Sequence, residues 1–367
     1  MVLVVNSLDK QAPQTAVTIN VSQGRNQVLL FTPLRILKGK RVVFEGQWNG
    51  LKVLAKLFST KRHYNRELKG LKTLEESKIE CPSVLFEGCA ENATGLDTYG
   101  FSNKPPYVLL LEFFPEAQDF RTLWRSALNE ERRSYLFSQL LNLIAQHHNN
   151  GIIQNDLHLG NFLVVNGRLI SIDGDAIDQK KSSTDDDYCK QVGILLAQSF
   201  PRYDLFLENL LPVYFDARNI DTSSNRLSII REYRALYRKK ACNNWIGKSF
   251  RNSTQFKAIK HFDKKIYMSK AYASLELENT LKKLADTMTP QDQEWTIDSC
   301  TFRSKFYPDK TVTDRKLLRE NEASVCWKEA QRKVFFGDSS SKPAALILKT
   351  SGPVHVSGLF VEVVSLP

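Results

Sequence analysis

Three side chains of the chain have the types and spacing that phosphoryl transfer requires. Asp156 is followed five residues later by Asn161, and an apolar stretch then leads to Asp173. One carboxylate must orient an attacking hydroxyl and accept its proton, which we assign to Asp156. An amide oxygen and a second carboxylate must hold Mg²⁺ against phosphates, because magnesium takes hard oxygen ligands, and we assign this to Asn161 and Asp173. From this loop alone, an ordinary polar surface turn remains an alternative.

A predicted hairpin explains how two metal ligands far apart in the chain can meet. Residues 162–165 and 168–172 are apolar segments on either side of Asn166-Gly167, a dipeptide typical of tight hairpin turns. Asn161 stands at the entrance of this hairpin and Asp173 at its exit. We therefore expect the two side chains to converge.

A lysine within an apolar strand is the second signal. Lys56 lies in the predicted strand 51–58, where a charge is costly unless it meets a partner or a ligand. The helical pattern over 64–74 places Glu67 on the same face as its apolar positions. An ion pair between Lys56 and Glu67 would position the α- and β-phosphates of a nucleotide. A lysine at a strand end beside an unrelated surface glutamate is the alternative.

The region around Lys56 has the pattern of an antiparallel sheet. Strands are predicted at 27–31, 41–45 and 51–58, and Gly46 and Gly50 bracket the turn between the last two. Gly46 would let this hairpin approach a phosphate closely. The turn lacks a full G-x-G-x-x-G, so an ordinary hairpin is also compatible with it.

Two further elements follow before the Asp156 loop. Residues 107–115 form a predicted buried strand that ends at a proline, and residues 130–149 form a predicted helix with Asn129 as its N-cap. We interpret His147 and His148 as helix-end residues and not as metal ligands, because no acidic or histidine partner stands at ligand spacing nearby.

Composition limits the class of protein. The chain has 367 residues, of which 42% are hydrophobic, enough for a sizeable core and two or three lobes or domains. Its six cysteines are scattered without a C-x-x-C pair, which is typical of reduced thiols in a cytosolic protein. No apolar stretch reaches the roughly eighteen residues of a membrane helix, and the first residues lack the pattern of a signal peptide. We expect a soluble or peripheral protein.

The charge of the chain favours anionic partners. The formal net charge is +11, and the stretch from Arg231 to Lys270 holds twelve Lys or Arg against two acidic residues. This stretch is compatible with a solvated helix face, or with a surface for acidic saccharide or lipid headgroups. Its interleaved aromatic residues would also suit nucleic acid, but no nucleic-acid-binding motif accompanies them, so we do not expect that partner.

These residues resemble the protein-kinase-like superfamily and, within it, the bacterial lipopolysaccharide kinase (Kdo/WaaP) family. The resemblance covers roughly residues 30–200 and is carried by the ordered set Lys56, Glu67, Asp156, Asn161 and Asp173. It implies an α+β, two-lobed protein-kinase-like fold, with an antiparallel β N-lobe, a mainly helical C-lobe and a C-terminal extension.

The expected organisation has four parts. They are an N-terminal segment 1–25, an N-lobe 26–115, a C-lobe 116–245 and an extension 246–367 without a functional interpretation. We expect the chain to be helical from 201 to about 290 and to form strands at 345–348 and 354–364.

The resemblance also implies chemistry. ATP and Mg²⁺ would serve as cofactors, and the γ-phosphate would pass to a sugar hydroxyl of the lipopolysaccharide core, an anionic saccharide, at the cytoplasmic face of the inner membrane. The catalytic residues would be Asp156, Lys56 and Glu67. The strand ending at Glu112 would lead into the hinge that binds adenine through its backbone. The implied ATP-binding set is Lys56, Glu112, Gly46, Asn161 and Asp173.

Departures from the protein-kinase pattern favour a non-peptide acceptor. Gln154-Asn155-Asp156 replaces H-R-D, so the arginine that would hold a phosphorylated activation loop is absent. His158 stands where a lysine is expected, and only fourteen residues separate Asp173 from Asp187. An atypical protein Ser/Thr kinase and a non-catalytic pseudokinase that binds partners are the alternatives.

Overall fold

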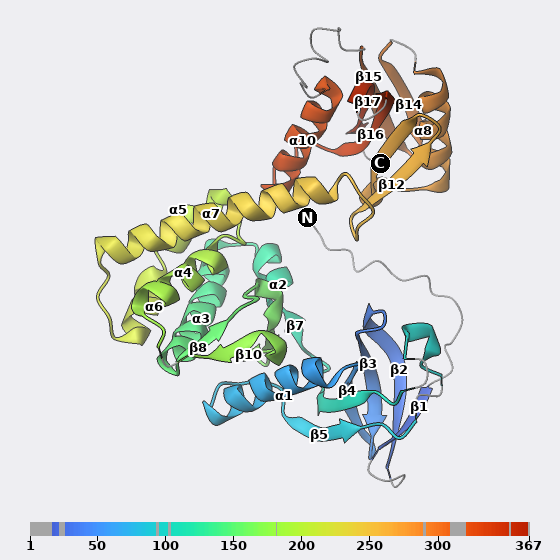
Figure 1. The fold of residues 1–367 in the computed structure, drawn as a ribbon. Coiled ribbons are helices and arrows are strands. Elements are labelled where there is room, and N and C mark those ends of the chain that lie inside the picture. The colour runs from blue at the N-terminus through green and yellow to red at the C-terminus, as the bar shows by residue number, and fades with distance from the viewer. Residues whose placement is uncertain are drawn as a thin grey trace. The chain divides into compact units, whose positions relative to one another are not determined.

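The computed structural model describes residues 17–21, 26–92, 95–101, 104–180, 182–288, 291–308, 321–351 and 354–365. The fold is mixed α+β and divides into two compact units, Val2–Ala235 and Leu236–Pro367 (Figure 1). Their boundary lies within helix α7 (Ser224–Lys248), earlier in that helix than the boundary after residue 245 expected from the sequence.

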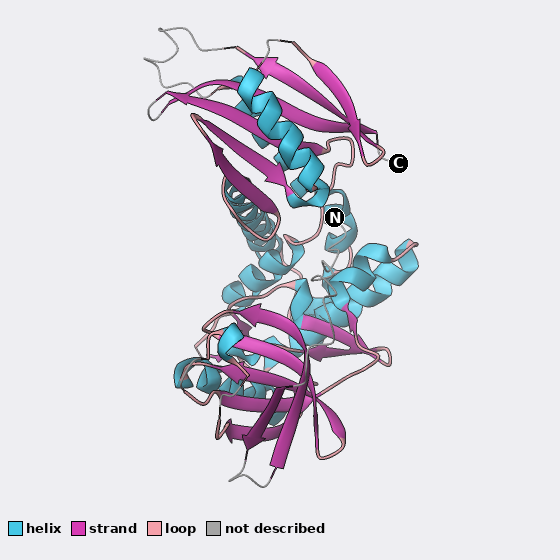
Figure 2. Ribbon diagram, turned by 90° about the vertical axis from the view of Figure 1, so that its right-hand side faces the viewer, coloured by secondary structure: helices cyan, strands magenta, loops and turns pink. Residues whose placement is uncertain are grey.

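The first unit begins with a six-stranded antiparallel sheet in the order β1-β2-β3-β4-β6-β5. The sheet is curled, as Figure 2 shows. Its strands are β1 (Val17–Val21), β2 (Asn26–Leu37), β3 (Arg41–Trp48), β4 (Leu51–Phe58), β5 (Val84–Cys89) and β6 (Tyr107–Glu112). Because β1 pairs with β2, the described part of the expected 1–25 segment is part of this sheet.

Strand β4 has different neighbours on its two faces, because side chains alternate along a strand. Val53, Ala55 and Leu57 point into the core inside the curled sheet. Leu54 and Phe58 point to the other face, where they pack with residues of helix α1 (Lys61–Glu76). Lys56 lies between Leu54 and Phe58 in this alternation, so the strand period directs it toward α1.

The rest of the first unit is mainly helical. It contains helices α2 (Phe120–Ser126), α3 (Glu130–Asn149), α4 (Asp185–Leu196), α5 (Asp204–Glu208) and α6 (Leu211–Arg218). Short strands complete it: β7 (Gln118–Asp119), β8 (Ile152–Gln154), β9 (Phe162–Val165), β10 (Arg168–Ser171) and β11 (Ile177–Gln179). One apolar core joins α2, α3, α4, α6 and β9, with Trp124, Phe137 and Phe215 among its largest members.

Helix ends in this part follow local sequence chemistry. The predicted bounds of α3 are confirmed, and the Asn129 Oδ1 accepts a hydrogen bond from the Arg132 N–H at 2.9 Å. Helix α4 begins at Asp185, and its first turn holds three acidic residues, Asp185, Asp186 and Asp187. Thr184 precedes this turn and forms a capping box with Asp187.

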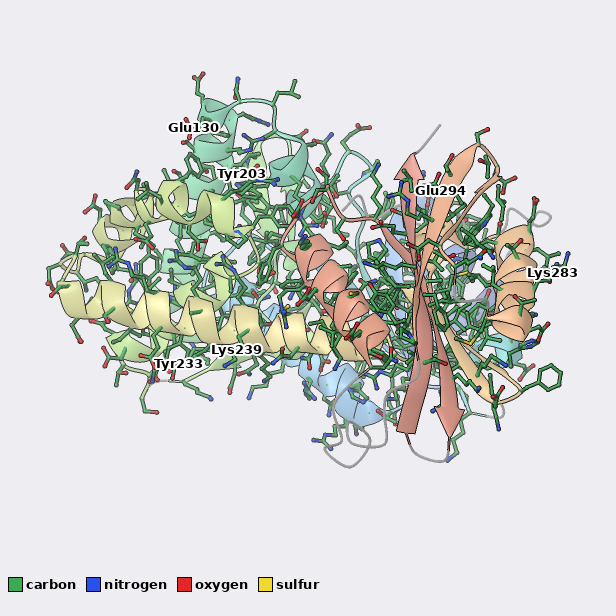
Figure 3. The ribbon with its side chains drawn as sticks, turned by 90° about the horizontal axis from the view of Figure 1, so that it is seen from above. Glu130, Tyr203, Tyr233, Lys239, Lys283 and Glu294 are labelled. Atoms are coloured by element: carbon green, nitrogen blue, oxygen red, sulfur yellow. The ribbon has the colours of Figure 1, made fainter. Side chains whose placement is uncertain are left out.

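The second unit contains another six-stranded antiparallel sheet, in the order β12-β13-β16-β17-β15-β14. Helices α8 (Leu275–Thr287) and α10 (Glu322–Phe335) cover opposite faces of it, and Lys283 of α8 projects away from the sheet (Figure 3). The strands are β12 (Phe256–His261), β13 (Lys264–Ser269), β14 (Gln293–Ile297), β15 (Cys300–Tyr307), β16 (Pro343–Ser351) and β17 (Val354–Ser365).

The prediction of helix up to about residue 290 is wrong for β12 and β13, whereas the predicted strands near the C-terminus are confirmed. The lysines at 257, 260, 264 and 265 interrupt the apolar residues of this hairpin without a period of two, which weakens the strand signal in the sequence. The hairpin is stabilised by β16, which pairs with β13 from about eighty residues further along the chain. Local sequence carries no information about that partner.

The basic stretch 231–270 is partly neutralised. Glu208 of α5 accepts hydrogen bonds from Arg231 at 2.7 Å and from Arg234 at 2.6 Å. Figure 3 shows Tyr233 and Lys239 of the same helix, α7, and the side chain of Lys239 is exposed. The positive charge that remains available is smaller than the sequence count indicates.

Across the described ranges, no helix is both long enough and apolar enough to cross a membrane.

Two adjacent histidines are buried at the end of α3. His147 and His148 are 1% and 3% exposed. The Nδ1 of His148 lies 2.7 Å from the Tyr214 hydroxyl, whereas neither ring nitrogen of His147 has a hydrogen-bond partner among the described residues. Burial lowers the pKa of His147 from 6.5 to about 4. The imidazole is therefore neutral in the folded protein at neutral pH.

This burial predicts a loss of stability in mild acid. Below the unfolded pKa of His147 the unfolded chain binds a proton that the folded chain excludes, so the free energy of unfolding falls as the pH falls toward the folded pKa. Between about pH 7.5 and about pH 5 we expect His147 alone to account for about 2 kcal/mol of lost stability. Urea denaturation at the two pH values should show a weaker pH dependence in His147→Leu. His63→Leu is the control, and an equal pH dependence in wild type and His147→Leu would contradict the expectation.

Candidate active site

A cavity of about 430 Å³ lies in the first unit, beside the sheet and the Asp156 loop. Apolar side chains from β3, β4, β6 and β9 line it, including Val43, Leu54, Leu111 and Leu163. Its polar lining residues are Arg35, Arg41, Lys56, Glu112, His158, Asn161 and Asp173. A mostly apolar cavity with a few convergent polar groups is the usual form of a small-molecule site.

The Lys56 ammonium and the Glu67 carboxylate form a buried ion pair between β4 and α1. Lys56 is 8% exposed and Glu67 is fully buried. Glu67 lies on the buried face of α1 with Leu71 and Leu74. Burial raises the pKa of Glu67, and the Lys56 charge acts in the opposite direction.

Glu67 has three further donors, and two of them belong to the backbone after Asp173. The N–H groups of Gly174 and Asp175 donate to its two oxygens, each at 3.2 Å. Arg41 of β3 donates from Nη1 at 3.4 Å. A buried carboxylate is tolerated when its lone pairs are satisfied, and here they are satisfied by donors from separate parts of the chain.

Two glycines allow α1 to approach the turn after Asp173. A Cβ on Gly70 would lie 2.0 Å from the Gly174 carbonyl oxygen, and a Cβ on Gly174 would lie 2.3 Å from the Glu67 carbonyl oxygen. Neither backbone could hold its position with a larger residue. The pair therefore sets the distance at which Glu67 reaches the N–H groups of Gly174 and Asp175.

The Asp156 loop is held by its backbone. The amide Nδ2 of Asn161 donates to the Asp156 carbonyl at 2.8 Å, which leaves the Asn161 Oδ1 available as a ligand. Gln198, just after α4, donates to the Leu157 carbonyl at 2.6 Å and accepts from the Leu159 N–H at 2.9 Å. Leu157 and Leu159 are themselves buried in the apolar core. The loop is thus held in place by the buried side chains of Leu157 and Leu159, on either side of His158, and by the hydrogen bonds of Gln198.

The Asp156 carboxylate points away from this anchored backbone. Its side chain is 74% exposed, it is absent from the cavity lining, and the His158 Nε2 lies 3.9 Å from its Oδ2. The other ring nitrogen of His158 lies 3.4 Å from the Arg121 Nη2. Burial and the Arg121 charge lower the pKa of His158, although Asp156 acts to raise it. Asp156 is thus placed where a solvent-side hydroxyl could reach it.

The hairpin β9–β10 returns the chain to Asn161. Asn166 and Gly167 have positive φ values of 50° and 78°, the turn expected from their sequence, and the predicted hairpin is confirmed. The Ile172 N–H donates to the Asn161 carbonyl at 2.9 Å, so Asp173 follows directly after a residue bonded to Asn161. Asn161 and Asp173 line the same cavity.

Asp173 has a strained backbone conformation and a carboxyl group whose ionised form is stabilised by its neighbours. It has a φ of 72°, which a non-glycine residue rarely adopts. Burial acts to raise the pKa of Asp173, but the neighbouring positive charges, chiefly Lys56 and then Arg41, lower it below its usual value. Its Oδ1 is buried without a hydrogen-bond partner. An ionised oxygen in that position is suited to a cation.

Asn161 and Asp173 fit the small protein contribution that Mg²⁺ needs. Within the part of the chain that the structure describes, no cluster of three or more His, Cys, Asp and Glu side chains could hold a metal ion. Magnesium commonly keeps several waters and takes one or two carboxylates together with substrate phosphates. The Asp173 Oδ1, which has no hydrogen-bond partner, and the available Asn161 Oδ1 match this requirement.

Gly46 lies away from this cavity. It sits within β3, paired with Leu30 and Val53, and the turn between β3 and β4 is the two-residue Asn49-Gly50. The prediction that Gly46 and Gly50 bracket the turn is therefore wrong. A Cβ on Gly46 would lie 2.7 Å from the Leu29 carbonyl oxygen, so close packing of β2 on β3 explains this glycine.

The hairpin beside the cavity is β2–β3, which the sequence interpretation missed. Its arms supply Leu34, Arg35, Arg41 and Val43 to the cavity, and its turn is Lys38-Gly39-Lys40. Arg41 and Val43 are two residues apart on β3 and therefore share a face with Lys56, which pairs directly with Val43. That register could not be read from the sequence.

Glu112 lines the cavity, but its carboxylate is engaged elsewhere. The Ser83 hydroxyl donates to Glu112 Oε2 at 3.1 Å. The next residues, 113–115, also line the cavity. Any recognition at this position would therefore involve the backbone after β6 more than the Glu112 side chain.

No protein-family model matches the chain, and no curated protein sequence matches it.

The glycine contact predicts an unusual response to alanine. In a helix interior, glycine to alanine ordinarily stabilises by about 1 kcal/mol. Gly70→Ala should instead destabilise by about 2 kcal/mol or more, because the new methyl group displaces the Gly174 backbone and breaks its hydrogen bond to Glu67. Urea denaturation would measure the change, with the exposed Lys69→Ala on the same helix as control. A Gly70→Ala protein as stable as wild type would contradict the close approach.

Proposed function

We propose that the chain is an ATP-dependent phosphotransferase with a two-lobed, protein-kinase-like arrangement of residues 26–115 and 116–245. The observation that carries the proposal is the convergence of Lys56, Asn161 and Asp173 on one cavity. Lys56 is oriented by Glu67, and the Asp156 carboxylate projects from the same loop as Asn161. These are the residue types that position and stabilise a transferring phosphoryl group.

Each side chain has a role in this proposal. Lys56 binds the α- and β-phosphates and Glu67 orients it. Asn161 and Asp173 would hold Mg²⁺, which neutralises phosphate charge when bound. Asp156 orients the acceptor hydroxyl and takes its proton, as the acceptor oxygen bonds to the γ-phosphorus and the bond from that phosphorus to the β–γ bridging oxygen of the nucleotide breaks.

The proposed acceptor is a sugar hydroxyl of the lipopolysaccharide core. This part rests on the resemblance of the Gln154–Leu163 loop to the lipopolysaccharide kinase family and on the short interval between Asp173 and α4. That interval offers little chain to dock a peptide. His158, which lies near Asp156, and Arg121, which lies beside His158, would add positive or polar character that suits an anionic saccharide. An acceptor of this kind implies peripheral contact with the cytoplasmic face of the inner membrane.

Asp156→Asn should abolish transfer and preserve nucleotide binding. Loss of the base is expected to lower kcat by about 10²–10⁴-fold, while the cavity that holds the nucleotide keeps its lining. The measurement is transfer of labelled phosphate from ATP, together with titration of a fluorescent ATP analogue. Asp178→Asn, on β11, is the control because Asp178 belongs neither to the Asp156 loop nor to the cavity lining. Full transfer activity in Asp156→Asn would refute its assigned role.

The acceptor is tested by offering labelled ATP with either purified lipopolysaccharide or a protein lysate. We expect label in the core oligosaccharide, where mass spectrometry would locate the phosphate. Label in protein alone would favour an atypical protein Ser/Thr kinase. Absence of Mg-ATP binding in a thermal-shift assay would favour a non-catalytic module that binds partners.

A further inference from the structure

We propose that, without a nucleotide, the Arg41 guanidinium occupies the position of the divalent cation at Asp173. When a nucleotide binds, the guanidinium moves to contact its phosphates. The proposal rests on the proposed function, because it assumes that Asp173 is a metal ligand. It adds a residue that controls the order in which metal and nucleotide bind.

The guanidinium of Arg41 lies between the two carboxylates of the site. Its Nη1 is 3.5 Å from the Asp173 Oδ1 and 3.4 Å from the Glu67 Oε2. The Arg41 side chain is only 13% exposed, so solvent screens these contacts weakly. The oxygen that Arg41 faces is the same buried Asp173 Oδ1 that lacks a hydrogen-bond partner. A metal ion at that oxygen would therefore meet the arginine.

The local charge opposes binding of metal alone. Arg35, Arg41 and Lys56 line the cavity, and their three charges are matched by the three carboxylates of Glu67, Glu112 and Asp173. A divalent cation without phosphates would therefore add uncompensated positive charge beside Arg41. A metal–nucleotide complex brings phosphate charge that offsets the cation, and arginine binds phosphate oxygens through two parallel N–H groups.

The backbone of Arg41 is held while its side chain can turn. Arg41 is the first residue of β3 and pairs with Leu37 on one side and Phe58 on the other. Lys56 can stay with Glu67 throughout, because Glu67 keeps the N–H groups of Gly174 and Asp175 as donors when Arg41 leaves. The exchange therefore requires a side-chain rotation and no movement of β3 or α1.

The experiment measures Mn²⁺ binding to the full chain by calorimetry, alone and with a non-hydrolysable ATP analogue. In Arg41→Gln we expect Mn²⁺ alone to bind about tenfold more tightly than in wild type, the size of effect that one partly buried charge produces. The Mn²⁺–analogue complex should bind about tenfold more weakly to the variant, because a phosphate contact is lost. Lys40→Gln is the matched control, since it removes an adjacent exposed cation that does not line the cavity.

Other outcomes overturn the proposal in distinguishable ways. Unchanged or weaker binding of Mn²⁺ alone in folded Arg41→Gln would make Arg41 a structural counter-ion of Glu67. If Arg41→Gln does not fold, Arg41→Lys decides, because lysine cannot reproduce the planar fork and should shift both affinities in the same directions by a smaller factor. If the wild type binds no Mn²⁺–analogue complex, the proposed function fails together with this proposal. The wild-type measurement therefore separates this outcome from one in which only the role of Arg41 is wrong.

Discussion

The site depends on keeping one charged carboxylate out of water. Glu67 is fully buried. The free-energy cost of an isolated buried charge exceeds the net stability of a typical domain, so hydrogen-bond donors must surround the carboxylate. They come from Lys56 on β4, Arg41 on β3, and the N–H groups of Gly174 and Asp175. The sheet, the first helix and the turn after Asp173 are thereby held together at one point.

This arrangement has a consequence for motion. Helix α1 and the turn after Asp173 are in backbone contact through Gly70 and Gly174. Withdrawal of α1 would leave Glu67 buried without its backbone donors, or would expose Lys56 and Arg41 without their partner. The ion pair is therefore built into the packing of the chain. Change at this site is easier through the Arg41 side chain than through movement of a helix.

The sequence predicted those parts of the site in which chemistry and period act locally. Asn166-Gly167 specified a turn that brings Asp173 back to Asn161, and the alternation of β4 directed Lys56 toward α1. It failed at Gly46, which has the residue type of a phosphate-binding turn but lies within a strand. It also missed Arg41, because the relevant contact depends on how β3 and α1 are placed against the turn after Asp173.

The same division holds for the fold as a whole. By itself the sequence determined the strands and helices with strong periods, the cap of α3 at Asn129, and the candidate residues Lys56, Glu67, Asp156, Asn161 and Asp173. Only the tertiary structure decided that 256–269 is a hairpin and that Arg41 lies between Glu67 and Asp173. The physical reason is that local patterns report how a segment can fold, whereas burial, register and charge pairing arise between segments distant in the chain.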